Sequence, residues 1–164
     1  MTDLHFYASA VIEGTIYGLG VDSTPDQWTA ELSDQCLDDA RKRRMRRDYG
    51  LIEVSFHRPK GEREWRCYAI SVQIHRLAWG IDNNIPERLN QEHGPFNEHM
   101  PFDAIYAEIQ ARGAQLEKNE GEPSPGFESY RLPSARSAVY VMRTQGSEDD
   151  PHQEGDVWSL GLVN

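Results

Sequence analysis

The sequence lacks the features of a membrane-bound or disulfide-stabilised protein. It has no apolar run of 18 residues, which excludes a transmembrane helix. The segment from Met1 to His5 has no basic region followed by an apolar core, so a signal peptide is not expected. Two cysteines, Cys36 and Cys67, are too few for a disulfide scaffold. Together these absences predict a cytoplasmic protein.

Recognisable catalytic motifs are also missing. The sequence has no G-x-S-x-G elbow, no P-loop and no G-x-G-x-x-G fingerprint. Gly18-Leu19-Gly20 is a lone G-x-G that does not predict dinucleotide binding. Neither cysteine belongs to a Cys-His motif. We therefore predict no catalytic residue, no cofactor and no metal ligand, and we expect a protein that is not an enzyme.

Acidic residues dominate the charge. The 164 residues carry 27 Asp and Glu against 17 Lys and Arg, a net charge of −10. This balance argues against a general nucleic-acid binder and favours basic partners. A chain of roughly 150 residues buries about 68–70% of its unfolded surface. The 16 aromatic residues supply material for that core, so a folded protein is expected.

The beginning of the chain predicts a strand and then a helix. Aromatic and β-branched residues over 4–17 predict one strand, or a pair that breaks near Glu13-Gly14. Thr24-Pro25-Asp26-Gln27 predicts a helix start with a capping box. That helix ends near Ser33 or continues through the basic residues up to Arg47.

An antiparallel hairpin is predicted next. Segments 49–57 and 65–77 alternate apolar with polar residues, which indicates strands with one solvated face. In the second segment, the side chains predicted to face the core are Tyr68, Ile70, Val72 and Ile74. Cys67 is predicted on the opposite face.

The second half repeats this order of elements. Residues 78–100 form a connector without periodicity, apart from a short helical turn indicated by Ile85 and Leu89. A helix starts at Pro101, and strands are predicted at 127–132, 137–143 and 156–163. We therefore predict a single α+β domain over 1–164, with an antiparallel sheet, helices on one face and two helix-hairpin repeats. The halves are 1–77 and 101–164.

A basic run, Arg41 to Arg47, has six basic residues in seven, while the rest of the chain is near −16. It favours either a nucleic-acid site or a helical face neutralised by Asp38–Lys42 and Asp39–Arg43 pairs four residues apart. Nucleic acid is the less favoured partner, because stacking platforms are absent from the run itself.

Metal-capable side chains gather within twelve positions, at Glu92, His93, Glu98, His99 and Asp103. The two histidines are six apart across a Gly-Pro turn, which is not a typical zinc spacing. A small metal-dependent enzyme that uses the His93–His99 region remains an alternative function, and a nucleic-acid binder through Arg41–Arg47 is another.

An aromatic and acidic surface is the leading functional prediction. Aromatic side chains anchor protein interfaces, and carboxylates steer basic partners. The candidate partner-binding residues are Glu53, His57, Trp65, Gln73, His75, Trp79, Glu148, Asp149 and Asp150.

The segment from Gly20 to Arg76 resembles small actinobacterial proteins of the toxin-immunity type. The likeness rests on the Gly18-Leu19-Gly20 turn, the capped helix, the basic run and the strands Asp48–Phe56 and Ala69–Arg76. The element order is similar to the tandem architecture of the β-lactamase-inhibitor-protein fold. This resemblance implies a sheet with one face free for a partner, and an immunity protein that blocks a cognate, basic toxin domain.

Overall fold

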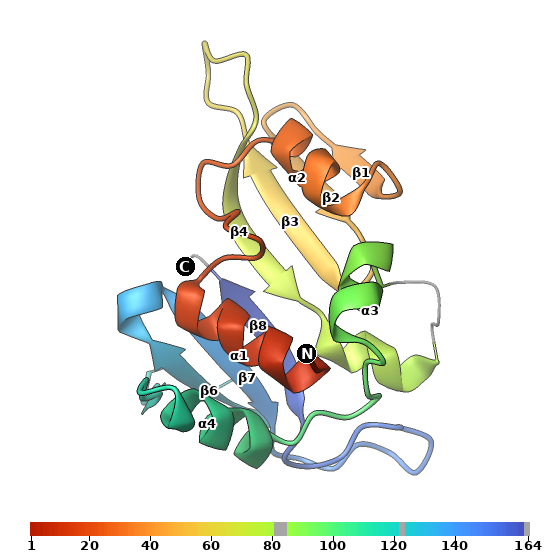
Figure 1. The fold of residues 1–164 in the computed structure, drawn as a ribbon, viewed down its shortest axis with the longest axis vertical. Coiled ribbons are helices and arrows are strands. Elements are labelled where there is room, and N and C mark those ends of the chain that lie inside the picture. The colour runs from red at the N-terminus through yellow and green to blue at the C-terminus, as the bar shows by residue number, and fades with distance from the viewer. Residues whose placement is uncertain (81–84, 122–123, 163–164) are drawn as a thin grey trace.

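The computed structural model describes residues 1–80, 85–121 and 124–162. Within them the protein has an α+β fold built on one antiparallel sheet of eight strands (Figure 1). The strand order is β1-β2-β3-β4-β8-β7-β6-β5. The strands are β1 (Leu37–Ala40), β2 (Arg44–Asp48), β3 (Ile52–His57), β4 (Arg66–Val72), β5 (Glu117–Lys118), β6 (Phe127–Leu132), β7 (Ser137–Met142) and β8 (Val157–Leu162).

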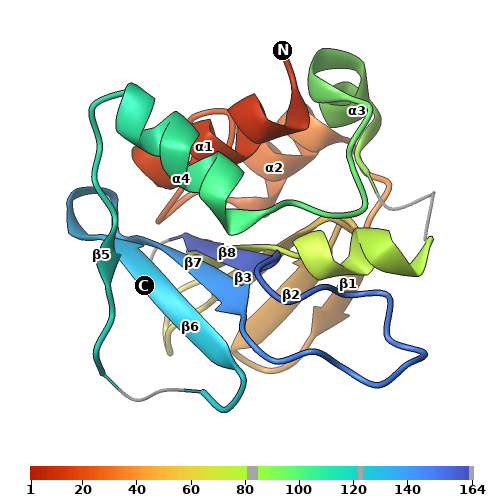
Figure 2. The same ribbon diagram turned by 90° about the horizontal axis from the view of Figure 1, so that it is seen from below.

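The α-helices lie on one face of this sheet (Figure 2). They are α1 (Asp3–Glu13), α2 (Pro25–Leu32), α3 (Glu87–His93) and α4 (Phe102–Ala111), with the 3₁₀ helices η1 (Ile74–Trp79) and η2 (Pro133–Ala135). None of the helices in the described residues is long and apolar enough to cross a membrane. The opposite face of the sheet, which we call the open face, carries no helix in Figure 2.

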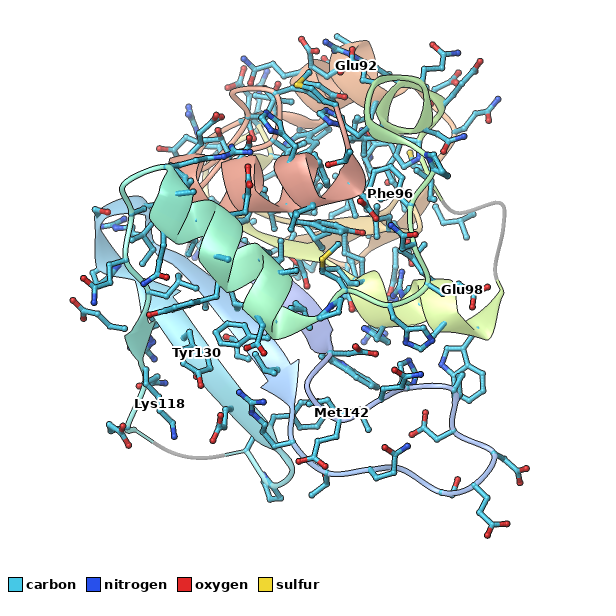
Figure 3. All side chains as sticks on the ribbon, turned by 60° about the horizontal axis from the view of Figure 1, so that its bottom comes forward. Glu92, Phe96, Glu98, Lys118, Tyr130 and Met142 are labelled. Carbon is cyan, nitrogen blue, oxygen red and sulfur yellow. The ribbon has the colours of Figure 1, made fainter. Side chains whose placement is uncertain are left out.

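Each half of the chain contributes four consecutive strands, and the halves meet where β4 pairs with β8. Ile70 lies opposite Leu162 and Val72 opposite Leu160, and all four side chains are buried. The buried apolar side chains of both halves form one cluster. Figure 3 shows Tyr130 on the strand beneath α4, where its ring stacks on Phe102 at 4.3 Å.

The predicted strand at residues 4–17 is wrong, because this segment forms helix α1. Phe6, Tyr7, Ala10 and Val11 are buried, at positions that share one side of a helix. Thr2 caps the first turn by accepting a hydrogen bond from the His5 backbone. Aromatic and β-branched composition indicated a strand, but the spacing of the buried residues is helical.

The short form of the second predicted helix is confirmed. Helix α2 ends at Leu32, and its capping box joins the Thr24 and Gln27 side chains to each other's backbone N–H groups. Trp28 and Leu32 are buried as their spacing predicts. Helix α4 likewise buries Ile105 and Ile109.

The predicted facing of the fourth strand is partly wrong because of a β-bulge. Ser55 pairs with Ala69 but Phe56 pairs with Cys67, so Tyr68 is an extra residue without a partner. The bulge turns Cys67 into the core and leaves Tyr68 40% exposed. The strand also ends at Val72, and Ile74 belongs to η1.

Strand β8 carries a matching irregularity. Tyr140 pairs with Ser159 and Val141 with Val157, so Trp158 is the extra residue. The last strand of each half, β4 or β8, therefore has an aromatic residue at a β-bulge.

Candidate functional site

The predicted partner-binding residues do not form one surface. Five of them gather beside η1 and the loop between β7 and β8, namely His75, Trp79, Glu148, Asp149 and Asp150. Together with His152 and Trp158 we call them the aromatic–acidic end. In Figures 1 and 2, η1 in yellow-green and the loop in blue lie on the same side of the molecule.

Stacked rings build the framework of this end. The His75 imidazole lies parallel to the Trp158 indole at a centroid distance of 4.2 Å. His152 is buried beside this stack, 4.7 Å from the Trp158 ring and 5.5 Å from the Trp79 ring. Because these rings come from η1, the loop and β8, their packing fixes all three elements to one another.

Hydrogen bonds of His152 hold the acidic loop in place. Its Nε2 lies 2.8 Å from the His75 carbonyl oxygen, and its Nδ1 contacts the Asp150 carboxylate. Asp150 also accepts a bond of 2.9 Å from the His152 backbone N–H. These bonds from His152 lower the pKa of Asp150, which keeps that carboxylate charged.

Charge and exposure differ within the aromatic–acidic end. Burial lowers the pKa of His75, and the charges of Arg76 and His152 lower it further against its bond to the Trp158 carbonyl. Trp79 is 58% exposed, and Glu148 and Asp149 are exposed in the loop next to Asp150. The aromatic–acidic end therefore has an exposed indole and exposed carboxylates, and the bonds of the buried His152 hold η1 and the loop together.

The Glu53 carboxylate is engaged in ion pairs with arginines of its own chain. Arg76 pairs with Glu53 and also contacts the Asp48 carboxylate at 3.1 Å and the Gly50 carbonyl at 2.8 Å. Arg46 lies 4.0 Å from the other Glu53 oxygen. This network neutralises Glu53 on the open face.

The other predicted contact residues lie elsewhere. Gln73 donates to the Ser71 hydroxyl at 2.9 Å, immediately before η1. His57 and Trp65 lie at the far end of the β3–β4 hairpin, where Arg58 covers the Trp65 ring at 4.4 Å. These two are separated from the aromatic–acidic end by the length of β4.

His152 and Trp158 make the contacts that join the elements of the aromatic–acidic end, but the sequence analysis did not name either residue. A histidine two residues from Asp150 in an acidic loop was the available signal for His152. Trp158 lay in a predicted strand, and its outward turn depends on the bulge, which alternation cannot reveal.

The basic run forms a hairpin rather than a helix, so the predicted Asp38–Lys42 and Asp39–Arg43 pairs are wrong. Strands β1 and β2 place Asp38 opposite Arg47 and Asp39 opposite Arg46. Arg47 holds the Asp38 carboxylate through bonds of 2.8 and 2.9 Å. Neutralisation by the preceding acids therefore occurs across strands, and chiefly at Arg47.

Metal-capable residues of the connector are separated by the fold. His93 is buried with its ring 5.3 Å from Phe6, and the His99 Nδ1 lies 2.7 Å from an Asp156 oxygen. Across residues 1–80, 85–121 and 124–162, no group of three or more His, Cys, Asp or Glu side chains is placed to hold a metal ion.

Both cysteines are free thiols in the described part of the chain. Burial raises the pKa of Cys67 to about 11, so its sulfur is protonated near neutral pH. Burial also raises the pKa of Cys36. Neither sulfur has the lowered pKa that activates a nucleophile.

No protein-family model, curated protein or solved structure gives a significant match to the chain.

Proposed function

We propose that the protein is a non-enzymatic protein-binding module, and most specifically an immunity protein that binds and blocks a cognate toxin. The observation that carries this proposal is the aromatic–acidic end. There an exposed Trp79 and the exposed carboxylates of Glu148 and Asp149 stand on a base fixed by His152.

Trp79 has the properties of an interface anchor. Tryptophan is enriched among the residues that dominate binding energy, because its large ring buries much apolar area when a partner covers it. The Trp79 ring meets the buried His152 ring edge-on at 5.5 Å. The contact with His152 restrains the Trp79 side chain before a partner binds, so less side-chain entropy is lost on binding.

The carboxylates of the loop between β7 and β8 favour a basic partner. Glu148, Asp149 and Glu154 are exposed in the same loop, and the whole chain has a net charge of −10. A field of this sign accelerates encounter with a basic surface and disfavours acidic ones. The proposed mechanism is steric: the bound module covers the working surface of a basic toxin domain.

Co-expression tests this function directly. The partner to use is the C-terminal domain of a secreted protein encoded by a neighbouring gene, which is the arrangement that the immunity resemblance implies. We expect the full chain to protect cells from that domain and to co-purify with it. The absence of both a complex at micromolar concentration and any protection would contradict the proposal.

Matched variants locate the contact. Trp79→Ala and the double variant Glu148→Gln with Asp149→Asn should weaken the complex at least tenfold, because truncation of an anchor costs about 2 kcal/mol or more. Arg136→Gln, an exposed change near η2, should leave binding unaltered.

A further inference from the structure

Positive charge is concentrated at the end of the molecule opposite the aromatic–acidic end. Residues 41–66 contain ten Lys and Arg against four Asp and Glu, in a chain whose net charge is −10. The fold brings both halves of this segment together, because the Arg58 backbone N–H donates to the Arg43 carbonyl at 3.0 Å. The β1–β2 turn and the β3–β4 hairpin thus form one basic tip, at the top of Figure 1.

A small hollow opens on the open face next to this tip. It has a volume of about 240 Å³. Its lining is Asp39, Arg41, Arg44, Met45, Arg46, Ser55 and Tyr68. Three arginines and one tyrosine therefore line this hollow, together with a single acidic residue, Asp39.

The aromatic ring in this hollow is there because of the β4 bulge. Tyr68 has no partner on β3, so its side chain leaves the core and is 40% exposed. The His57 ring lies 5.6 Å away, on the strand that pairs with both Arg44 and Arg66. The basic run itself contains no aromatic residue on which a base could stack. In the folded protein, Tyr68 of β4 and His57 of β3 bring aromatic rings next to it.

Ion pairs neutralise the hollow only weakly. Arg41 lies 3.9 Å from Asp39, and both side chains are largely exposed. Arg46 lies 4.0 Å from Glu53, whose other oxygen is held by Arg76. The Arg41–Asp39 pair is exposed and contributes little, and the Arg46–Glu53 contact of 4.0 Å is too long for a hydrogen bond. The arginines therefore keep most of their attraction for an anion.

We propose that the hollow and the basic tip bind a segment of single-stranded nucleic acid. Phosphates would contact Arg41, Arg44 and Arg46, and one base would stack on Tyr68. An aromatic face combined with a basic groove is how proteins hold single strands without reading sequence. A duplex keeps its bases stacked on one another, so the exposed Tyr68 ring favours a single strand.

The acidic remainder of the molecule does not prevent this binding. The Debye length is about 8–10 Å at physiological salt, so acids at the other end of the sheet are screened from the hollow. This site is separate from the aromatic–acidic end, and its test requires no toxin.

Fluorescence anisotropy with a labelled oligouridylate of ten nucleotides tests the proposal on the full chain. We expect binding at 50 mM salt. Three phosphate contacts predict a loss of about 20-fold in affinity between 50 and 200 mM salt. Tyr68→Ala should weaken binding roughly tenfold, while Tyr68→Phe should retain it, because stacking needs the ring and not the hydroxyl.

Charge variants separate this site from general attraction. Arg44→Glu should abolish measurable binding at 200 mM salt. Arg131→Glu, an exposed change on β6, and Trp79→Ala, an aromatic change at the other end, should bind as the wild type does. Circular dichroism of every variant shows that the fold is kept.

Three results would overturn the proposal. The first is no binding of the oligonucleotide at 50 mM salt, and the second is equal weakening by Arg44→Glu and Arg131→Glu. The third is displacement of the oligonucleotide by polyglutamate at an equal concentration of charge, which would assign the tip to an acidic protein surface instead.

Discussion

Arg47 joins three elements through one buried guanidinium. It binds Asp38 on β1, and it donates to the Pro25 carbonyl and the Thr29 hydroxyl of α2 at 2.9 Å each. The bond to Asp38 raises the pKa of Arg47, so the side chain stays charged. Its neighbour Arg46 points to the open face. Because side chains alternate along β2, Arg47 is buried and stabilises the fold, whereas Arg46 is exposed on the open face.

The change Arg47→Met tests the structural task. We expect a loss of about 2–3 kcal/mol in the free energy of unfolding, because hydrogen bonds to a charged group disappear and their acceptors are left unpaired. Arg46→Met, whose side chain is exposed, should change stability by less than about 0.5 kcal/mol. Urea unfolding followed by circular dichroism measures both, and equal losses would contradict the assignment.

His93 links stability to pH. Burial lowers its pKa against the raising effect of Glu92, and the charges of the N-terminus and His5 lower it further. The unfolded chain, whose histidines titrate near pH 6.5, therefore takes up this proton first as pH falls. Since the unfolded state then binds more protons than the folded one, the free energy of unfolding decreases below about pH 6.5.

We expect His93→Phe to flatten that decrease. Urea midpoints at pH 7.5 and 5.5 should lie closer together in the variant than in the wild type. A residual slope remains from His75, whose pKa burial also lowers. Parallel slopes for His93→Phe and the wild type would contradict this account.

Helix α1 ends because Gly14 turns the chain. Gly14 has a φ of 66°, and a Cβ at this position would lie 2.3 Å from the Ala135 carbonyl oxygen. Gly18 has a similar φ of 75°, but a Cβ there would meet nothing within 4 Å. Substitution at Gly18 loses stability only through its positive φ, whereas substitution at Gly14 also creates a steric clash. Comparing the two positions therefore separates these two losses in the free energy of unfolding.

Gly14→Ala should therefore destabilise more than Gly18→Ala. The left-handed conformation alone costs about 1–2 kcal/mol for a residue with a side chain, and both variants share this loss. Only Gly14→Ala must also displace η2 from the end of α1. Thermal unfolding of the two variants measures the difference, and equal midpoints would contradict the close packing of α1 on η2.

Local patterns predicted the elements whose determinants are local. The capping box of α2 and the alternation of Ile52, Val54 and Phe56 depend on neighbours within a few positions, and both are confirmed. Helix α1 was misread because its composition resembles that of a strand. The bulge at Tyr68 depends on the pairing of β4 with β3, which no single segment encodes.

Five of the seven residues of the aromatic–acidic end were named from the sequence, because residue type is a local property. Exposed aromatic and acidic residues such as Trp79 and Asp149 could be named from their types. Their approach to one another could not, because the bond between His152 and the His75 carbonyl joins residues 77 positions apart. Such contacts follow from the meeting of β4 and β8, where the two halves share a sheet.

At the scale of the whole molecule, the two halves share one sheet and one core, and a helix of the first half packs on the second. Helix α1 begins the chain but packs on α4, β7 and β8 of the second half. The Ser137 hydroxyl donates to the Val11 carbonyl at 2.6 Å, and Arg112 donates to the Ser9 hydroxyl at 2.8 Å. We therefore expect both halves to unfold together.

The change Ile105→Ala tests this cooperativity. Ile105 is buried in α4 of the second half, so its truncation should cost about 2–5 kcal/mol. In a background where Trp65, Trp79 and Trp158 are phenylalanine, fluorescence reports on Trp28 in the first half. We expect Ile105→Ala to shift the Trp28 and circular dichroism transitions equally. An unshifted Trp28 transition would show that the halves unfold separately.

The central claim is that this protein binds a protein partner through its aromatic–acidic end. Titration calorimetry of the toxin domain into wild type, Trp79→Ala and Tyr68→Ala tests it most directly, because these variants remove exposed aromatic rings from opposite ends of the sheet. We expect a one-to-one complex that Trp79→Ala weakens at least tenfold and Tyr68→Ala leaves unchanged. Loss of affinity in Tyr68→Ala with none in Trp79→Ala would contradict binding through the aromatic–acidic end.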